Sequence, residues 1–377
     1  MIYLNNGASS YPKPQEVINA VINYINSVPL NPYRSGFKRP SFIEDCREKL
    51  CLLLNAKERK NIIFTSGGTE SLNLAIMGLE LRNSHVITTV IEHNSVLRPL
   101  KYLERERFID LSIVKCNNNG SVNPYDIEKE IRENTGLIIV NHCSNVTGEL
   151  LDLKSISEIA HKKDILFAVD ASQSAGHIPI DVTAWNIDIL AFTGHKALYG
   201  LAGTGGLYLK EGIKLKPLKF GGTGIRSELI YQPEEFPLYY ESGTLNLPGI
   251  VSLCSGLDFI LKKGIDEIRR KEEALMEKLV SELKDIPQVI IYGSHDRSKR
   301  TPVLSFNIKG MTPEDTGYIL EESFGIIVRS GLHCAPLIHK YLDSYPQGTI
   351  RVSPSYFTEF HDIDCFVKAI KEIVNTL

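Results

Sequence analysis

The sequence predicts an α/β protein with a large, mainly parallel sheet domain and a smaller α+β domain. The chain has 377 residues, whereas single hydrophobic cores stop growing at roughly 250–300 residues. Between about residues 60 and 210, short apolar runs alternate with helical patterns, and from about residue 249 longer helices dominate. We therefore expect a large domain over residues 15–248 and a smaller one formed by residues 1–14 and 249–377.

The apolar runs of the large domain are expected to be strands buried on both faces. They are rich in Ile, Val and Leu and lack strict alternation with polar residues, as in parallel sheets covered by helices. The runs are NIIFTS, HVITTV, LSIVKC, LIIVN, ILFAVD, IDILAFT and GGLYLK. In an open α/β sheet, ligands bind beyond the carboxyl ends of the strands. The polar residues that follow each run are therefore the candidate site residues.

Helical periodicity predicts the remaining elements. Val17, Val21 and Ile25 recur at a spacing of four, which predicts an N-terminal helix that packs beside the smaller domain or bridges the two domains. One long charged amphipathic helix is expected over residues 256–285. It is followed by the strand PVLSFNI, a helix near 313–324 and a terminal helix near 360–376.

Composition and charge favour a small-molecule substrate. The chain is 43% hydrophobic and 23% charged, with a net charge of −3 and no long basic run, so nothing predicts nucleic acid or membrane as a partner. The N-terminal residues lack the pattern of a secretory leader, and we expect a cytoplasmic protein. Seven scattered cysteines without metal-ligand spacing are expected to be reduced thiols, most of them packing residues.

The run NIIFTSGGTES predicts a phosphate cradle. A strand is followed by Gly67 and Gly68, and then by a helix that opens at Thr69. Glycines let the backbone approach a ligand closely, and the free amides of a helix N-terminus bind phosphate. An ordinary capped helix after a strand has the same pattern. Because no lysine follows as in a P-loop, a nucleoside triphosphate site is not expected.

Asp170 and Lys196 end neighbouring strand–turn units and can address the same planar ligand. A buried carboxylate such as Asp170 is costly without a cationic partner, and a protonated pyridine nitrogen is such a cation. Gln173 can then reach the ring hydroxyl. Lys196 follows an apolar strand between glycine turns, a setting that lowers an amine pKa and suits imine formation. Alone, Asp170 would be read as a turn cap and Lys196 as a surface lysine.

His93 and Asn145 also follow strands at this edge of the sheet. A histidine at that place can stack on a ring and move protons, and Asn145 can contact a cofactor or a substrate carboxylate. Without the Asp170 and Lys196 pair, His93 would be interpreted as a structural hydrogen-bonding residue. Asn145 would be an unremarkable loop residue.

The C-terminal part of the chain supplies Arg329, Cys334 and Arg351. Arg351 leaves an apolar strand and can bind an α-carboxylate with two hydrogen bonds, and Arg329 is a second candidate for substrate binding. Unlike most of the other cysteines, Cys334 lies in a glycine-containing loop, beside Arg329 and His333. That setting predicts a nucleophilic thiol, with a chance surface thiol as the alternative.

Together these segments resemble the class V aminotransferase family, and within it the cysteine desulfurases and selenocysteine lyases. The resemblance runs over nearly the whole chain and implies the PLP-dependent transferase fold type I, which is aspartate-aminotransferase-like. The VRSGLHCAP loop resembles the short loop of the SufS-like group (group II), although Leu332, Pro336 and the IHKYLDSYPQG continuation depart from that pattern. The segments that carry the resemblance, in family order, are YLNNGASS, SGGTES, EHNSV, SNVTGE, VDASQSAG, TGHKALYG, SGTLN, VRSGLHCAP and RVSPSYF.

The resemblance implies pyridoxal 5'-phosphate (PLP) as cofactor and assigns residues to it. Lys196 would carry it as a Schiff base, His93 would stack on its ring, and Asp170 and Gln173 would hold the ring nitrogen and hydroxyl. Thr244 would reach the phosphate in a neighbouring subunit, which implies a homodimer. The phosphate in the chain's own site would be bound by Gly68, Thr69, Thr193 and His195.

The implied reaction converts L-cysteine to L-alanine, with the sulfur passed to Cys334 as a persulfide and then to a sulfur-acceptor protein. His93 and Lys196 would carry protons. Selenocysteine lyase, acting on L-selenocysteine, is the first alternative. A class V aminotransferase or epimerase acting on another amino acid is the second, and a PLP-binding scaffold or sulfur-carrier binding module without turnover is a third.

Overall fold

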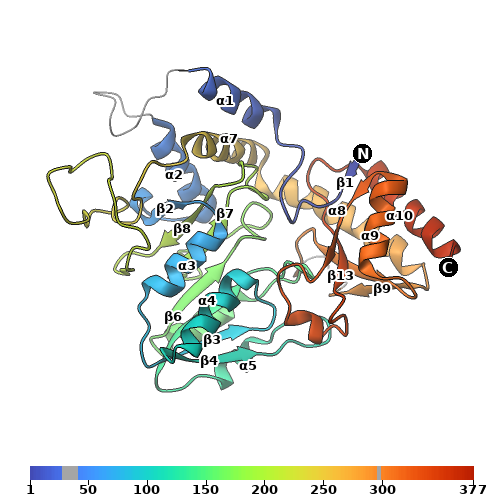
Figure 1. Ribbon diagram of the computed structural model, residues 1–377, viewed down its shortest axis with the longest axis horizontal. Helices are drawn as coiled ribbons and strands as arrows, with labels where there is room; N and C mark the ends of the chain where they lie inside the picture. The colour runs from blue at the N-terminus through green and yellow to red at the C-terminus, as the bar shows by residue number, and fades with distance from the viewer. Residues whose placement is uncertain (28–40, 295–298) are drawn as a thin grey trace.

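The computed structural model describes residues 1–27, 41–294 and 299–377. Two domains lie side by side (Figure 1). In the described part of the chain, the large domain is built on a seven-stranded sheet with the spatial order β2 (Ile62–Thr65), β8 (Gly205–Leu209), β7 (Ile189–Thr193), β6 (Leu166–Asp170), β5 (Thr135–Asn141), β3 (Ser84–Thr89) and β4 (Ile109–Val114).

The sheet is mainly parallel, as the sequence predicted. Strands β3, β4, β5, β6 and β7 pair in parallel, whereas β8 is antiparallel to both β2 and β7. The carboxyl ends of all the other strands therefore meet the beginning of β8 at one edge. Gly205, the first residue of β8, pairs there with Thr65 and Thr193.

Helices cover both faces of this sheet, and successive strand residues face opposite layers. Ile63 packs with one layer, whereas Ile62 and Phe64 pack with the other. The first layer contains α3 (Gly68–Gly78) and α4 (Asn94–Arg105). The second contains α1 (Gln15–Ile25), α2 (Ser41–Leu54), α5 (Pro124–Lys129), α6 (Leu153–His161) and α7 (Leu247–Lys263).

The smaller domain has a separate core around an antiparallel sheet. Its strands have the order β12 (Arg329–Gly331), β13 (Thr349–Val352), β10 (Leu304–Ile308) and β9 (Val289–Tyr292), and β1 (Ile2–Tyr3) pairs in parallel with β11 (Ile326–Ile327). Helices α8 (Ile265–Lys284), α9 (Pro313–Phe324) and α10 (Phe360–Asn375) pack on it. Short 3₁₀ turns lie at Arg59–Asn61 and Ile338–Lys340.

One sequence prediction about helices was wrong. The single helix expected over 256–285 is divided at Gly264, which has a positive φ of 82° and separates α7 from α8. The N-terminal helix α1 packs on α7, most of which falls within the predicted smaller domain but whose buried residues belong to the core of the large sheet. Val17 is buried there, whereas Ile25 is 66% exposed.

The predicted domain limits stay a prediction. Leu253 and Leu257 of α7 belong to the core of the large sheet, and Leu275 of α8 belongs to the core of the smaller domain. The packing therefore favours a division near Gly264 rather than at residue 248. Among the described residues, no helix has the length and apolar character needed to cross a membrane.

Candidate active site

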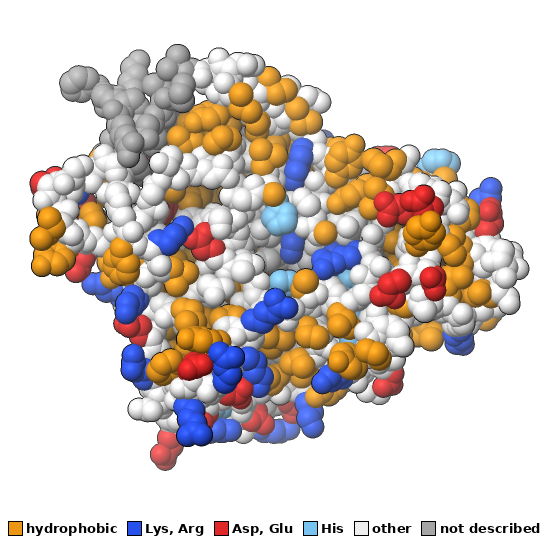
Figure 2. Space-filling view, in the orientation of Figure 1, with side chains coloured by type: hydrophobic (Ala, Val, Ile, Leu, Met, Phe, Trp, Pro, Cys, Tyr) orange, Lys and Arg blue, Asp and Glu red, His pale blue; other side chains and the backbone are white. Residues whose placement is uncertain are grey.

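A cavity of about 340 Å³ lies at the edge where the carboxyl ends of the large-domain strands meet. Figure 2 shows histidine and cationic side chains gathered near the middle of the face shared by the two domains. Both domains line the cavity. The predicted site residues that line it are Gly68, Thr69, His93, Asn145, Asp170, Gln173, Thr193, His195, Lys196, Arg329 and Arg351.

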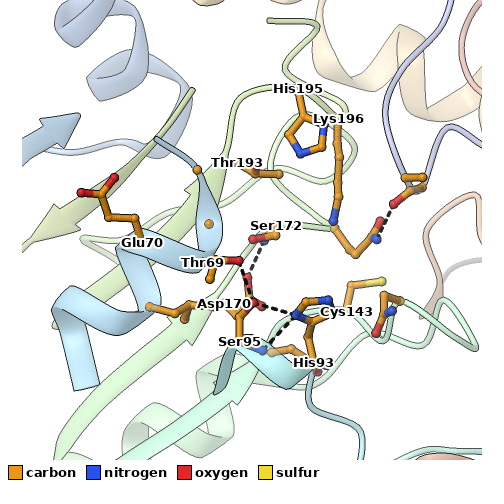
Figure 3. A pocket seen from close by; sticks show the side chains of 18 of the residues that line it. Thr69, Glu70, His93, Ser95, Cys143, Asp170, Ser172, Thr193, His195 and Lys196 are labelled. Carbon is orange, nitrogen blue, oxygen red and sulfur yellow. Dashed lines mark hydrogen bonds between the residues drawn. The ribbon is translucent and has the colours of Figure 1, made fainter. Parts of the chain in front are cut away.

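Lys196 lies in the connection between β7 and β8, residues 194–204. This connection is closed by hydrogen bonds from Gly194 N to Thr204 O (2.8 Å) and from Gly200 N to Gly194 O (2.8 Å). Its side chain extends into the pocket (Figure 3). Burial lowers the pKa of Lys196 to about 8, while the nearby Asp170 carboxylate opposes that shift. Part of the amine is therefore unprotonated, and nucleophilic, near neutral pH.

Asp170 is the last residue of β6 and faces the same space as Lys196. Its Oδ1 accepts a hydrogen bond from Ser172 N at 2.9 Å, and the residue is 6% exposed. The described ranges contain no salt bridge to Asp170. A buried carboxylate without a fixed counter-ion suits a cationic ligand group.

His93 closes another side of the pocket from the start of α4. It is the N-cap residue of that helix, and its Nδ1 accepts a hydrogen bond from Ser95 N at 3.0 Å. Burial lowers the pKa of His93 to about 4, with Asp170 opposing the shift. The imidazole is therefore neutral at physiological pH.

The predicted phosphate cradle is present at the start of α3. Gly67 has a φ of 150° and precedes the helix. A Cβ atom on Gly68 would lie 2.6 Å from Ser172 Oγ, so a larger residue would displace that hydroxyl. Thr69, Thr193 and His195 line the same end of the cavity, and Figure 3 shows Thr69 and Thr193 close to the helix start. Free helix amides and hydroxyls bind phosphate at such a place.

Arg351 is a fully buried guanidinium on β13. Its Nη1 donates to Asn145 O at 3.1 Å and its Nη2 to Asn5 Oδ1 at 3.3 Å, and Nε has no partner within the described residues. Burial and the neighbouring Arg329 lower the pKa of Arg351 to about 9. No carboxylate of the described chain pairs with Arg351. A carboxylate ligand would supply the hydrogen-bond acceptor and the negative charge that the Arg351 guanidinium lacks.

Cys334 does not line the cavity but lies beside it. Arg329, which lines the cavity, donates from Nη2 to Cys334 Sγ at 3.3 Å. His333 and Cys334 both have left-handed backbone angles, with φ of 51° and 59°. The large domain holds this turn, because Asn94 N donates to Cys334 O at 2.7 Å and Asn145 Nδ2 donates to His333 O at 2.6 Å.

The remaining predicted residues differ in placement. The Gln173 amide donates to Gly7 O at 2.9 Å and so ties the N-terminal segment to the pocket wall. Thr244 is exposed and lies outside the cavity of its own chain.

Cys334 is exposed and Cys365 half-buried, whereas the other cysteines are buried free thiols, which confirms that most are packing residues.

Sequence reasoning missed several lining residues. Ser172 was recognisable only from its position between Asp170 and Gln173, and Ser95 only from its position two residues after His93. Gly7 and Cys143 had no signal of their own. Cys143 Sγ lies 2.9 Å from Thr301 Oγ1, and burial raises its thiol pKa to about 12.

Comparisons with known proteins agree with this architecture. A probable cysteine desulfurase of Methanothermobacter thermautotrophicus is 36% identical over 382 residues, covering 99% of this chain and 94% of the relative. A probable cysteine desulfurase of Pyrococcus abyssi is 33% identical, covering 100% and 95%. The apo structure of a cysteine desulfurase from Thermococcus onnurineus NA1 matches with a TM-score of 0.93 at 32% identity, covering 100% of this chain and 95% of that one.

The fold is therefore that of the fold-type-I PLP-dependent transferases, as the sequence predicted. The aminotransferase class-V family matches residues 2–366, and the chain belongs to this family.

Proposed function

We propose that the protein is a PLP-dependent cysteine desulfurase that converts L-cysteine to L-alanine and passes the sulfur to Cys334. The full-length relatives described above carry that name. The observation that carries the proposal is the position of Cys334, an exposed thiol hydrogen-bonded to Arg329, which itself lines the cavity. A thiol so placed can receive an atom from a ligand in the pocket and then present it at the surface.

The pocket complements PLP group by group. A helix start that opens with Gly67 and Gly68 suits the phosphate, the Asp170 carboxylate without an ion pair suits a protonated ring nitrogen, and the partly unprotonated Lys196 suits the aldehyde. Thr69, Thr193 and His195 would hold the phosphate, and His93 would lie against the ring with Gln173 at its hydroxyl. When bound, the ring supplies an electron sink that acidifies the substrate Cα–H bond.

The remaining groups bind the substrate and accept its sulfur. Arg351, with Asn145 and Arg329 beside it, binds the α-carboxylate, and the Lys196 amine moves the Cα proton. The Cys334 thiolate attacks the substrate sulfur. A sulfur–sulfur bond forms while the substrate carbon–sulfur bond breaks, and the carbon fragment gains a proton to leave as alanine. The sulfur stays on Cys334 as a persulfide, and no outside oxidant is needed.

The test is a comparison of Cys334→Ser with the wild-type protein, with L-cysteine and a thiol reductant present. We expect the variant to lose coupled release of alanine and sulfide while it retains the PLP absorbance, because only the sulfur acceptor is removed. Cys365→Ser, on the exposed side of α10, is the matched control and should keep full activity. Undiminished release by Cys334→Ser would contradict the proposal, as would keto-acid or inverted amino acid as the main product.

The acting unit is proposed to be a cytoplasmic homodimer that delivers sulfur to an acceptor protein. Thr244, exposed on its own chain, would complete the phosphate site of the partner subunit. The segment that leads to Thr244 exposes large apolar side chains, as expected of a subunit interface. These are Leu218, Phe220, Leu229, Ile230 and Tyr231, with Ile230 90% exposed.

A further inference from the structure

A row of hydrogen bonds connects the starts of α3 and α4 across the pocket. Thr69 Oγ1 lies 2.9 Å from Ser95 Oγ, and Ser95 Oγ lies 2.9 Å from His93 Nδ1. The backbone N–H of Ser95 also points to His93 Nδ1, at 3.0 Å. Figure 3 shows Ser95 between the other two side chains. The middle member of the row therefore contacts both the predicted phosphate cradle and the predicted ring-stacking histidine.

The Ser95 backbone determines which nitrogen of His93 carries the proton. An amide N–H can only donate, so His93 Nδ1 must accept. The neutral imidazole therefore has its proton on Nε2. A second proton, on Nδ1, would face the Ser95 N–H and the positive end of the α4 dipole. Both disfavour the protonated imidazole. Among the surrounding charged groups, Asp170 favours a charged ring, whereas Lys196, Arg329 and Arg351 oppose it.

An anion at the start of α3 determines the direction of the two hydroxyl groups. Each hydroxyl has one hydrogen. When Thr69 donates to a phosphate, it has no hydrogen left for Ser95, and the Ser95 hydroxyl can donate to Thr69 Oγ1 or to His93 Nδ1. Because Nδ1 already accepts the backbone N–H of Ser95, Thr69 Oγ1 is the acceptor that still lacks a donor. With the Ser95 hydrogen directed to Thr69, the backbone N–H alone donates to His93 Nδ1, and the 2.9 Å contact between Ser95 Oγ and Nδ1 holds no hydrogen.

We propose that Ser95 is a positioning residue of this active site: its backbone N–H holds His93 with the proton on Nε2, and its hydroxyl directs the Thr69 hydrogen to the phosphate. The role in catalysis rests on the function proposed above. His93 then acts as a neutral hydrogen-bond donor through Nε2. The Cα proton is carried by Lys196 rather than shared between Lys196 and His93.

The first test measures the tautomer of His93 by nitrogen NMR in the full-length, cofactor-free protein labelled with ¹⁵N-histidine. His93→Gln assigns the signal by removing it. We expect a pyridine-type Nδ1 and a pyrrole-type Nε2 at neutral pH, in the wild-type protein and in Ser95→Ala, because the backbone N–H is present in both. A proton on Nδ1 in either protein would overturn the assignment.

The second test measures the affinity of the same cofactor-free protein for inorganic phosphate by titration calorimetry. Ser95→Ala should weaken binding about fivefold, the effect of one ordinary hydrogen bond. Ser95→Thr keeps a hydroxyl and should restore most of that loss. Ser281→Ala, on the surface of α8, should bind like the wild type. Equal affinity of Ser95→Ala and the wild-type protein would overturn the hydroxyl role. Neither measurement needs turnover, so both remain decisive if the desulfurase activity is absent.

Discussion

The chemistry of the site depends first on the protonation of single residues. Burial lowers the pKa of Lys196 to about 8, and only the free amine attacks an aldehyde. We therefore expect the rate at which cofactor-free protein forms its chromophore with added PLP to rise with pH through about 8 and then to level off. Stopped-flow absorbance between pH 6 and 9.5 measures this rate.

Lys13 provides a necessary comparison for this titration, because burial lowers its pKa to about 8 as well. Its ammonium is bound to Ser10 Oγ and to the carbonyl oxygens of His195 and Gly200. Lys196→Ala should give no chromophore at any pH, whereas Lys13→Met should still form one. A half-point near that of an ordinary exposed lysine would show that Lys196 is not desolvated.

Some residues of the site could be predicted from the sequence, and others could not. Asp170 and Lys196 were predictable because each follows a buried strand, and strand ends converge at one edge of a parallel sheet. The role of Ser95 was not predictable. It depends on a contact with Thr69, 26 residues earlier in the chain, and on which nitrogen of His93 accepts a backbone hydrogen bond. Side-chain contacts between separate turns leave no periodic pattern in the sequence.

At the scale of elements, Glu92 links the ends of two strands. Its Oε1 accepts from Thr89 Oγ1 of β3 at 2.6 Å and from Asn141 N of β5 at 3.1 Å, and its Oε2 has no partner within the described residues. Burial raises the pKa of Glu92 to about 8. The folded protein therefore keeps this proton up to about pH 8, whereas the unfolded chain releases it above about 4.5.

This difference in proton binding makes the folded state less stable as pH rises from about 5 to 8. Glu92→Gln cannot ionise, so it should gain stability over the wild type across that range, by roughly 2 to 4 kcal/mol at pH 8. Urea unfolding midpoints at pH 5.5 and pH 8 measure the change. Glu158→Gln, at an exposed position of α6, should leave the pH dependence as it is. Parallel profiles for Glu92→Gln and the wild type would contradict a buried neutral carboxyl.

The contact between β8 and the start of α3 gives a second prediction at this scale. A Cβ on Gly205 would lie 2.6 Å from Gly67 Cα and 2.7 Å from Phe192 O, so the backbone of the phosphate cradle would have to move. We expect Gly205→Ala to weaken PLP binding at least about tenfold, in line with the cost of overpacking. Spectroscopic titration of the cofactor-free protein measures this. Gly136→Ala, near the amino end of β5, meets only ordinary contacts of 3.5 Å or more and is the control. Equal binding by both variants would show that the cradle is not held by this contact.

At the scale of the whole molecule, the N-terminal segment joins the two domains at the site. Leu4 belongs to the core of the smaller domain, Gly7 lines the cavity, and Lys13 donates to the turn that carries Lys196. The composition of this segment gave no indication that it crosses between the domains. The change from short apolar runs to longer helical patterns near residue 249 predicted two cores. The helix break at Gly264 was missed because the charged amphipathic pattern continues through it.

Whether two chains share each site can be decided by mixing two impaired variants, Lys196→Ala and Thr244→Val. If Thr244 serves the partner subunit, a mixed dimer contains one repaired site, in which the chain with Lys196 receives Thr244 from its partner. Unfolding and refolding the two variants together should therefore restore up to about half of the wild-type activity per mixed dimer, because one of the two sites is complete. Each variant refolded alone is the control. If Thr244 acts within its own chain, or if the protein is a monomer, the mixture will show no more activity than the average of the separate variants. Sedimentation of the wild-type protein distinguishes these two outcomes.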